Sequence, residues 1–215
     1  MDILDYNAIT LPEFAARLAS SSPVPGGGGA AAYSGCLGVS LIAMVANLTL
    51  GKKKYADVEQ EVQQILARAD ELRTTLFEGV PKDSAAFLHV SVAYKMPEST
   101  PEEQAAKSAE LSLRSKAAAD LPMELARCCH EGLQLAVRMA EIGSLLAVSD
   151  VVCGAGLLLA ALKGLLMMVS VNLPLVDNEQ YVQAMQQEYS RLLVTGTELE
   201  ARVNAAVDAR AAQVL

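Results

Sequence analysis

The stretch from Gly26 to Gly51 contains no charged residue, and this feature restricts the possible folds of the chain more than any other. It opens with four consecutive glycines and is rich in alanine and serine. The pattern predicts a helix from about Ala30 to Leu50 with a face that neighbouring backbones can approach closely. A second stretch, 151–173, has Lys163 as its only charge, so the fold must cover two apolar helices. The small residues of the first helix recur at spacings of three and four: Ala32, Gly35, Cys36, Val39, Ala43 and Ala46.

A membrane-spanning helix is the alternative explanation for these stretches. The first one, however, is built of Gly, Ala and Ser rather than Leu and Phe, and no aromatic belt marks its ends. The N-terminal segment also lacks a basic region followed by an apolar signal core. We therefore expect a cytoplasmic protein without a membrane partner, whose four cysteines stay reduced.

Composition favours helices over strands. Hydrophobic residues make up 52% of the 215 residues, aromatic residues only 4%, and tryptophan is absent. Ala, Leu and Val must then form the core, as in close-packed helices. The formal net charge of -8 argues against a nucleic-acid partner, because such a partner requires a basic face. We expect an all-α fold in one domain, residues 1–215, with about eight helices packed around the apolar ones.

Capping signals and prolines mark the boundaries of these helices. Thr10 and Thr100 each begin a capping box with a following proline, which predicts two helix starts. The segment 58–76 has the pattern of an amphipathic outer helix. We expect Pro81 to open a further helix and Pro122 to break or kink the helix in which it lies. The remaining predicted caps are Ser149 or Asp150 for the second apolar helix and Asp177 or Asn178 for the last helix, which should reach about Val214.

Gly26, Gly27 and Gly28 lie in a turn that runs directly into the first apolar helix. Glycines allow a ligand to approach the backbone closely, and the free amides at a helix start favour an anion. The turn matches neither the P-loop nor the dinucleotide-binding motif. A tight corner between two helices explains it equally well.

Lys52, Lys53 and Lys54, followed by Tyr55, form the one dense basic cluster of this acidic chain, at the point where the first apolar helix ends. Lysines at that position neutralise the C-terminal carbonyls of the helix, which is a purely structural explanation. The functional explanation is a docking point for a ligand with several carboxylates.

Asp83 and Asp150 are the candidate catalytic acids. Asp83 shares a helical face with Phe87, Val90 and Tyr94, while Asp150 lies at the start of the second apolar helix. Both could be ordinary charges at helix N-termini. Burial would favour catalysis, because it raises the pKa of a carboxyl group towards the range useful for proton transfer.

The run Cys128, Cys129 and His130 resembles a metal site at first sight. Consecutive helical side chains point about 100° apart, so these three cannot converge on one ion. We expect no metal cofactor. A Ser-His-Asp hydrolase is equally unsupported, because no serine lies in a nucleophile elbow.

Five motifs, in this order and at these separations, resemble those of a known family: PVPGGGGAAAYSG, MVANLTLGKKKY, KDSAAF, AVSD and VSVNLPL. By them the chain is identified as a member of the formiminotetrahydrofolate cyclodeaminase and methenyltetrahydrofolate cyclohydrolase family. The resemblance implies an all-helical homodimer that binds tetrahydrofolate, the carrier of the one-carbon unit, in a cleft between helices. The residues that match the family's motifs are Gly26, Gly27, Gly28, Asn47, Gly51, Lys52, Tyr55, Asp83, Ala86, Phe87, Pro122, Ser149, Asp150 and Asn172.

The resemblance implies one of two reactions at the same carbon. The cyclodeaminase expels ammonia from a formimino group, and the cyclohydrolase adds water to the methenyl carbon. A free-standing domain favours the cyclohydrolase, with Asp83 as the acid/base group and Asp150 beside the cationic carbon. Many members carry an aspartate where this chain has Pro81 and an asparagine where it has Met168. A non-catalytic, folate-binding dimer is therefore the alternative.

Overall fold

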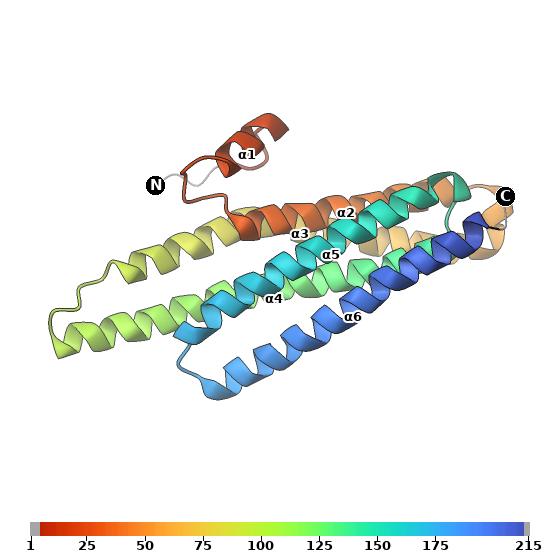
Figure 1. The fold of residues 1–215 in the computed structure, drawn as a ribbon. Coiled ribbons are helices and arrows are strands. Elements are labelled where there is room, and N and C mark those ends of the chain that lie inside the picture. Colours follow the sequence, from red (N-terminus) through yellow and green to blue (C-terminus); the bar gives the residue numbers. More distant parts are fainter. Residues whose placement is uncertain (1–4, 213–215) are drawn as a thin grey trace.

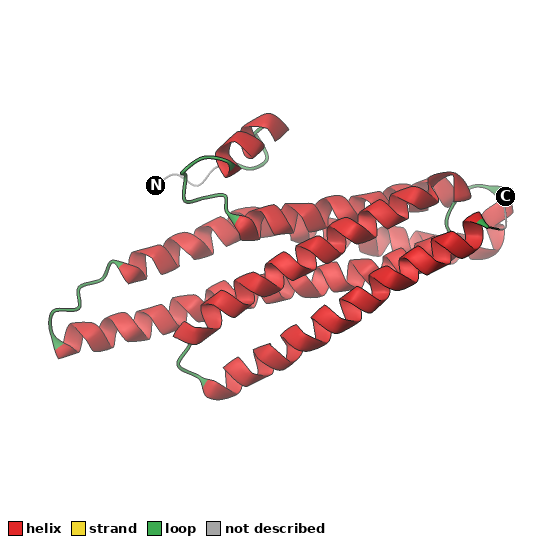
Figure 2. Ribbon diagram, viewed as in Figure 1, coloured by secondary structure: helices red, strands yellow, loops and turns green. Residues whose placement is uncertain are grey.

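The computed structural model describes residues 5–212, and within that range it contains six α-helices and no strand (Figures 1 and 2). The expected all-α class is confirmed. Three short 3-10 helices, Lys53–Val58, Leu145–Ala147 and Leu173–Leu175, lie between the α-helices. The α-helices are α1 (Leu11–Leu18), α2 (Gly27–Thr49), α3 (Glu59–Tyr94), α4 (Pro101–Ile142), α5 (Val148–Asn172) and α6 (Glu179–Ala211).

Helices α2 to α5 form an elongated bundle, α6 packs against α4 and α5, and the short α1 lies apart near the start of α2 (Figure 1). Helix α2 packs on α3 and α5, and α4 packs on α3 and α5. Helices α2 and α5 are antiparallel, because Gly38 lies against Gly154 while Gly27 lies near Met168. The two apolar stretches of the sequence are therefore neighbours along their whole length.

The small-residue face predicted for α2 is buried, as expected. A Cβ atom added at Gly38 would lie 2.9 Å from the carbonyl oxygen of Gly154, and one added at Gly154 would lie 3.0 Å from that of Gly38. Only glycine leaves room for two backbones at this separation. The crossing of α2 and α5 thus depends on the residue type at these two positions.

Six helices form instead of eight because α3 continues through Pro81 and α4 through Pro122. A proline inside a helix costs about 3 kcal/mol, since it removes one hydrogen bond and crowds the preceding turn. Both helices are held by buried residues on either side of the proline, such as Leu76 and Val90 in α3. Packing against neighbouring helices therefore outweighs the local preference of proline to end a helix.

Helix starts follow the sequence signals with two corrections. Capping boxes form at Thr10 and Thr100, and Asn178 caps α6 by accepting a hydrogen bond from the Tyr181 amide. Helix α5 already begins at Val148 with Ala147 as its N-cap, so the expected caps Ser149 and Asp150 lie inside its first turn instead. Helix α2 begins at Gly27, three residues earlier than predicted.

Helix α5 is not surrounded on all sides, in contrast to the expectation. Among the described residues, α2 and the segment Leu145–Leu175 are long and apolar enough to span a membrane by length and composition, and about half of each apolar window is buried. One stripe of each helix is exposed, and on both helices it borders the contact with the other helix. The two stripes form one surface, the α2–α5 face, made of Leu37, Met44 and Leu48 together with Cys153, Gly156, Ala160, Lys163 and Met167.

Candidate functional site

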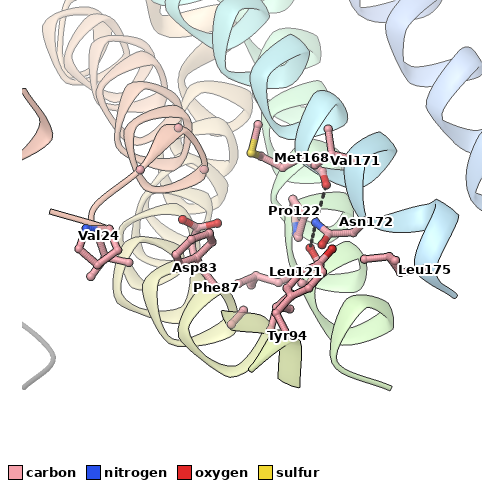
Figure 3. A pocket seen from close by; sticks show the side chains of 17 residues that line it. Val24, Asp83, Phe87, Tyr94, Leu121, Pro122, Met168, Val171, Asn172 and Leu175 are labelled. Atoms are coloured by element: carbon pink, nitrogen blue, oxygen red, sulfur yellow. Dashed lines mark hydrogen bonds between the residues drawn. The ribbon is translucent and has the colours of Figure 1, made fainter. Parts of the chain in front are cut away.

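A pocket of about 350 Å³ lies at one end of the bundle, beyond the first turn of α2. Helices α3, α4 and α5 extend past the point where α2 begins (Figure 1), and the pocket lies between these three extensions. The pocket brings together the glycine turn, the second half of α3, the middle of α4 and the end of α5 (Figure 3). Six of the residues predicted to form the site line it: Gly26, Gly27, Gly28, Asp83, Phe87 and Asn172.

Asp83 points from α3 at the first turn of α2 (Figure 3). A Cβ atom at Gly28 would lie only 2.0 Å from Oδ1 of Asp83, so this position must be glycine for the carboxyl group to sit there. Burial raises the pKa of Asp83, and the backbone amide of Gly29 acts in the opposite direction. The glycine turn therefore accommodates the protein's own acid, and a raised pKa is the property that a carboxyl group needs for proton transfer.

Apolar side chains form the walls of the pocket. Phe87 and Tyr94 follow Asp83 along one face of α3, as the sequence spacing predicted, and each is about half exposed. Met168 and Val171 of α5 lie on the opposite side (Figure 3). A slot with an aromatic wall and an acid at its inner end suits a flat, partly polar ring system.

Asn172 is oriented by a proline on the neighbouring helix. Its Nδ2 atom donates to the carbonyl of Met168 at 2.8 Å and to the carbonyl of Ala118 at 3.3 Å (Figure 3). The Ala118 carbonyl has no helical donor, because the residue four positions later is Pro122. Both partners are pure acceptors, so the amide nitrogen must point at them. Oδ1 accepts no hydrogen bond within residues 5–212 and is left to accept one from a ligand.

The other predicted site residues lie at the far end of the bundle. Asn47 lies in the last turn of α2, about 28 Å along that helix from Gly28. Tyr55 accepts a hydrogen bond from the Leu145 amide at 3.2 Å and so ties the segment after α2 to the start of α5. Within one chain the pocket residues and this second group do not meet. The second group consists of Asn47, Lys52, Lys53, Lys54, Tyr55, Ser149 and Asp150.

The two departures from the family pattern differ in their consequences. Pro81 lines a separate hollow, with Tyr6 and Arg73, so its side chain contributes nothing to the pocket. Met168 does line the pocket and makes its α5 side apolar. His89, six residues after Asp83, lies on another face of α3: it is exposed and is not among the pocket residues.

Sequence reasoning missed several apolar residues of the pocket, namely Val24, Leu121, Val171 and Leu175. Apolar residues at helical spacing look like ordinary core positions, so the sequence holds no signal that separates them from the core. Within the described residues no group of three or more His, Cys, Asp or Glu side chains is placed to hold a metal ion.

Comparisons with known proteins agree with the motif resemblance. A family model described as formiminotransferase-cyclodeaminase matches residues 10–191. The chain is 39% identical over 194 residues to a methenyltetrahydrofolate cyclohydrolase of Methylorubrum extorquens, covering 90% of this chain and 93% of that protein. It is 29% identical to the formimidoyltransferase-cyclodeaminase of Gallus gallus over 97% of this chain, but spans only 39% of that longer protein.

The fold agrees as well. The crystal structure of formiminotetrahydrofolate cyclodeaminase from Thermotoga maritima matches with a TM-score of 0.84 and 30% sequence identity, covering 95% of this chain and 98% of that one. Most of the chain is thus matched by the family model, by a relative of nearly equal length and by a solved structure. The chain belongs to the formiminotransferase-cyclodeaminase family.

Proposed function

We propose that this protein is a one-carbon enzyme that acts on tetrahydrofolate derivatives, and that it is a methenyltetrahydrofolate cyclohydrolase. The observation that carries the proposal is the partly buried Asp83 carboxyl group between the glycine turn and an aromatic wall, where burial raises its pKa. The similarity to the cyclohydrolase of Methylorubrum extorquens over nearly the full length of both proteins supports this choice of reaction.

The cyclohydrolase reaction requires a base beside a cationic carbon. Water attacks the methenyl carbon of 5,10-methenyltetrahydrofolate, and the Asp83 carboxylate takes one proton from that water. The same proton passes to N5 as the bond between that carbon and N5 breaks. The second proton of the water is released as the formyl carbonyl forms, which leaves 10-formyltetrahydrofolate.

The pocket suits the pterin end of the substrate. Phe87 and Tyr94 offer aromatic contact, and Oδ1 of Asn172 offers an acceptor for an amino or ring N–H group of the pterin. None of the residues lining the pocket is lysine or arginine. The glutamate carboxylates of folate must therefore find positive charge outside it.

The direct test mixes purified protein with 5,10-methenyltetrahydrofolate and follows the loss of its near-ultraviolet absorbance. We expect hydrolysis well above the rate in buffer, and the Asp83→Asn variant should lose most of this excess. If the wild-type protein binds the folate but does not accelerate hydrolysis, the protein is a non-catalytic folate-binding protein.

Cyclodeaminase activity is the second candidate, favoured by the structural match to the Thermotoga maritima enzyme. In this reaction N10 attacks the formimino carbon on N5, and ammonia leaves. Burial raises the pKa of the Asp83 carboxyl group, so this group keeps its proton to a higher pH than an ordinary aspartate and can donate the proton that the departing nitrogen needs. Release of ammonia from 5-formiminotetrahydrofolate measures this activity directly.

We also propose a cytoplasmic homodimer that works without a metal cofactor. The exposed apolar α2–α5 face supports self-association, since soluble monomers rarely leave a continuous apolar surface of this kind uncovered. The four cysteines are free, which suits a reducing compartment. Light scattering at micromolar concentration tests the dimer, and unchanged turnover after treatment with a chelator tests the absence of a metal requirement.

A further inference from the structure

Helix α3 has a locally weakened turn directly before Asp83. Pro81 has no backbone N–H group, so the carbonyl of Phe77 lacks the donor that the residue four positions later supplies in an ordinary helix. The Asp83 carboxyl group, two residues after this proline, nevertheless has to meet the first turn of α2 closely, since a Cβ atom at Gly28 would lie only 2.0 Å from its Oδ1 atom. A contact from outside α3 can supply the restraint that the backbone of this turn lacks.

The N-terminal segment makes such a contact at Ser84, the residue next to Asp83. The hydroxyl group of Tyr6 lies 2.8 Å from Oγ of Ser84, and this hydrogen bond is buried. Oγ of Ser84 also donates to the carbonyl of Val80 at 3.3 Å, so it accepts the hydrogen bond from Tyr6. Ser84 is fully buried and Tyr6 is 8% exposed. Loss of the Tyr6 hydroxyl group would therefore leave a buried polar atom with one partner fewer.

Aromatic packing holds Tyr6 in place over α3. Its ring contacts Phe14 of α1, with 6.4 Å between the ring centroids. Phe14 lies 5.5 Å from Tyr33 of α2, and Tyr33 lies 6.4 Å from Phe77 of α3, again between ring centroids. Edge-to-face and tilted pairs at these separations stabilise a structure beyond the burial of their area. This aromatic cluster therefore fixes the N-terminal segment to both helices whose contact positions Asp83 against the glycine turn.

The N-terminal strap, residues 6–26, connects this contact to the pocket. From α1 the chain runs through Val24, which lines the pocket, into the first turn of α2 (Figures 1 and 3). At one end of the strap Tyr6 binds the residue after Asp83, and the other end leads into Gly28, which adjoins the Asp83 carboxyl group. The strap is therefore anchored beside Asp83 at both of its ends.

We propose that Tyr6 is a positioning residue of this enzyme, whose hydrogen bond to Ser84 fixes the turn of α3 that carries Asp83 and so sets the place of the carboxyl group in the pocket. Tyr6 is not among the residues that line the pocket, so it acts through Asp83 and not on the substrate. The proposal rests on the proposed function for the reaction that Asp83 serves. Loss of the Tyr6 hydroxyl group displaces the acid and leaves the pocket walls in place.

Tyr6→Phe removes the hydroxyl group and keeps the ring in the aromatic cluster. A misplacement of about 1 Å in a catalytic group costs on the order of 100-fold in rate, so a smaller displacement of Asp83 should lower kcat for 5,10-methenyltetrahydrofolate by about tenfold. The KM should stay within about twofold of wild type, because the walls that bind the folate do not change. A fall in binding alone, with kcat unchanged, would overturn the proposal.

Tyr33→Phe is the matched control, since Tyr33 belongs to the same aromatic cluster and its hydroxyl group makes no hydrogen bond within residues 5–212. It should leave both kcat and KM unchanged. Equal losses in Tyr6→Phe and Tyr33→Phe would mean that the cluster as a whole supports the fold and that the bond to Ser84 has no role of its own.

Combined variants test whether Tyr6 acts through Ser84 and Asp83. Ser84→Ala should lower kcat by about the same factor as Tyr6→Phe, and the two together should lower it no further, because both remove the same hydrogen bond. Tyr6→Phe added to Asp83→Asn should leave the remaining rate unchanged within about twofold. A further tenfold loss on top of Asp83→Asn would overturn the proposal, since Tyr6 would then act on some other group.

The titration of Asp83 provides a measurement that does not depend on turnover. Burial raises the pKa of Asp83. Tyr94 is the other titratable side chain that lines the pocket, and none of the residues lining it is lysine, arginine or histidine. A displaced carboxyl group is more exposed to water, so carbon-13 NMR should show Asp83 titrating at a lower pH in folded Tyr6→Phe than in the wild type. The Asp83→Asn variant assigns the signal.

The same titration separates this proposal from the proposed function. Tyr33→Phe should titrate at Asp83 as the wild type does. An unchanged pKa of Asp83 in folded Tyr6→Phe would overturn the positioning role, whatever the activity of the wild type. A lowered pKa of Asp83 in a protein that converts neither folate would refute the proposed function and support the role of Tyr6 in placing the carboxyl group.

Discussion

Replacing Gly28 by alanine tests the closest contact of the site. The added methyl group would lie 2.0 Å from Oδ1 of Asp83, and contacts of this kind are essentially never shorter than 3.0 Å, so the carboxyl group must retreat by about 1 Å or more. A misplacement of about 1 Å in a catalytic group costs on the order of 100-fold in rate. We therefore expect kcat/KM for 5,10-methenyltetrahydrofolate to fall by about two orders of magnitude.

Stability should change much less than activity in Gly28→Ala. Crowding costs about 1–3 kcal/mol, and alanine recovers up to about 1 kcal/mol over glycine within a helix. The free energy of unfolding, measured with urea, should therefore fall by no more than about 3 kcal/mol.

Gly29→Ala is the matched control, because its methyl group would lie 3.6 Å from Val80 and 3.7 Å from Asp83, which are ordinary contacts. It should keep activity within a few-fold of wild type. If a folded Gly28→Ala protein retains more than half of the wild-type kcat/KM, the position of Asp83 does not govern catalysis.

Three further predictions concern the same pocket. Asp83→Asn should lower turnover by about 10²- to 10⁴-fold with folate affinity nearly intact, as titration of bound folate would show. Asp83→Asn should also melt at a higher temperature than the wild type at neutral pH, because burial raises the pKa of Asp83 and so disfavours the charged carboxylate in the folded protein. The stability of the wild type relative to this variant should fall as the pH rises from the pKa of the unfolded carboxyl group to that of the folded one. Above the folded-state pKa the difference should stay constant. In the pH profile of kcat/KM, hydrolysis should decline on acidification at a higher pH than an ordinary aspartate would give. Pro122→Ala gives the Ala118 carbonyl a helical donor and frees Asn172 to turn, so unfolding free energy should rise by up to about 3 kcal/mol while the KM for folate increases.

Local signals in the sequence predicted much of the fold. The capping boxes at Thr10 and Thr100 and the buried small-residue face of α2 follow from rules that act within one or two turns of a helix. Pro81 and Pro122 misled the helix count, because the packing that carries α3 and α4 through them involves residues distant in the sequence. Such packing cannot be read from a local pattern.

The site was predictable only in part for the same reason. Helical spacing placed Asp83 and Phe87 on one face of one helix, and the structure confirms that arrangement. Spacing does not show which end of one helix meets which end of another. Helical spacing therefore could not predict that Asp83 lies against Gly28 while Asp150 lies at the far end of the bundle.

The hydrogen bond from Asn172 to the Ala118 carbonyl has a consequence for the history of the family. The carbonyl needs an outside donor only because residue 122 is proline, and the amide of Asn172 is fixed only because that carbonyl is free. Asn172 is fully oriented only when Pro122 leaves the Ala118 carbonyl free, and Pro122 leaves that carbonyl without a donor unless Asn172 is present. Loss of the proline in a descendant would relax selection on the asparagine, and loss of the asparagine would leave a bare carbonyl that favours reversion of the proline. The two positions should therefore change together or not at all.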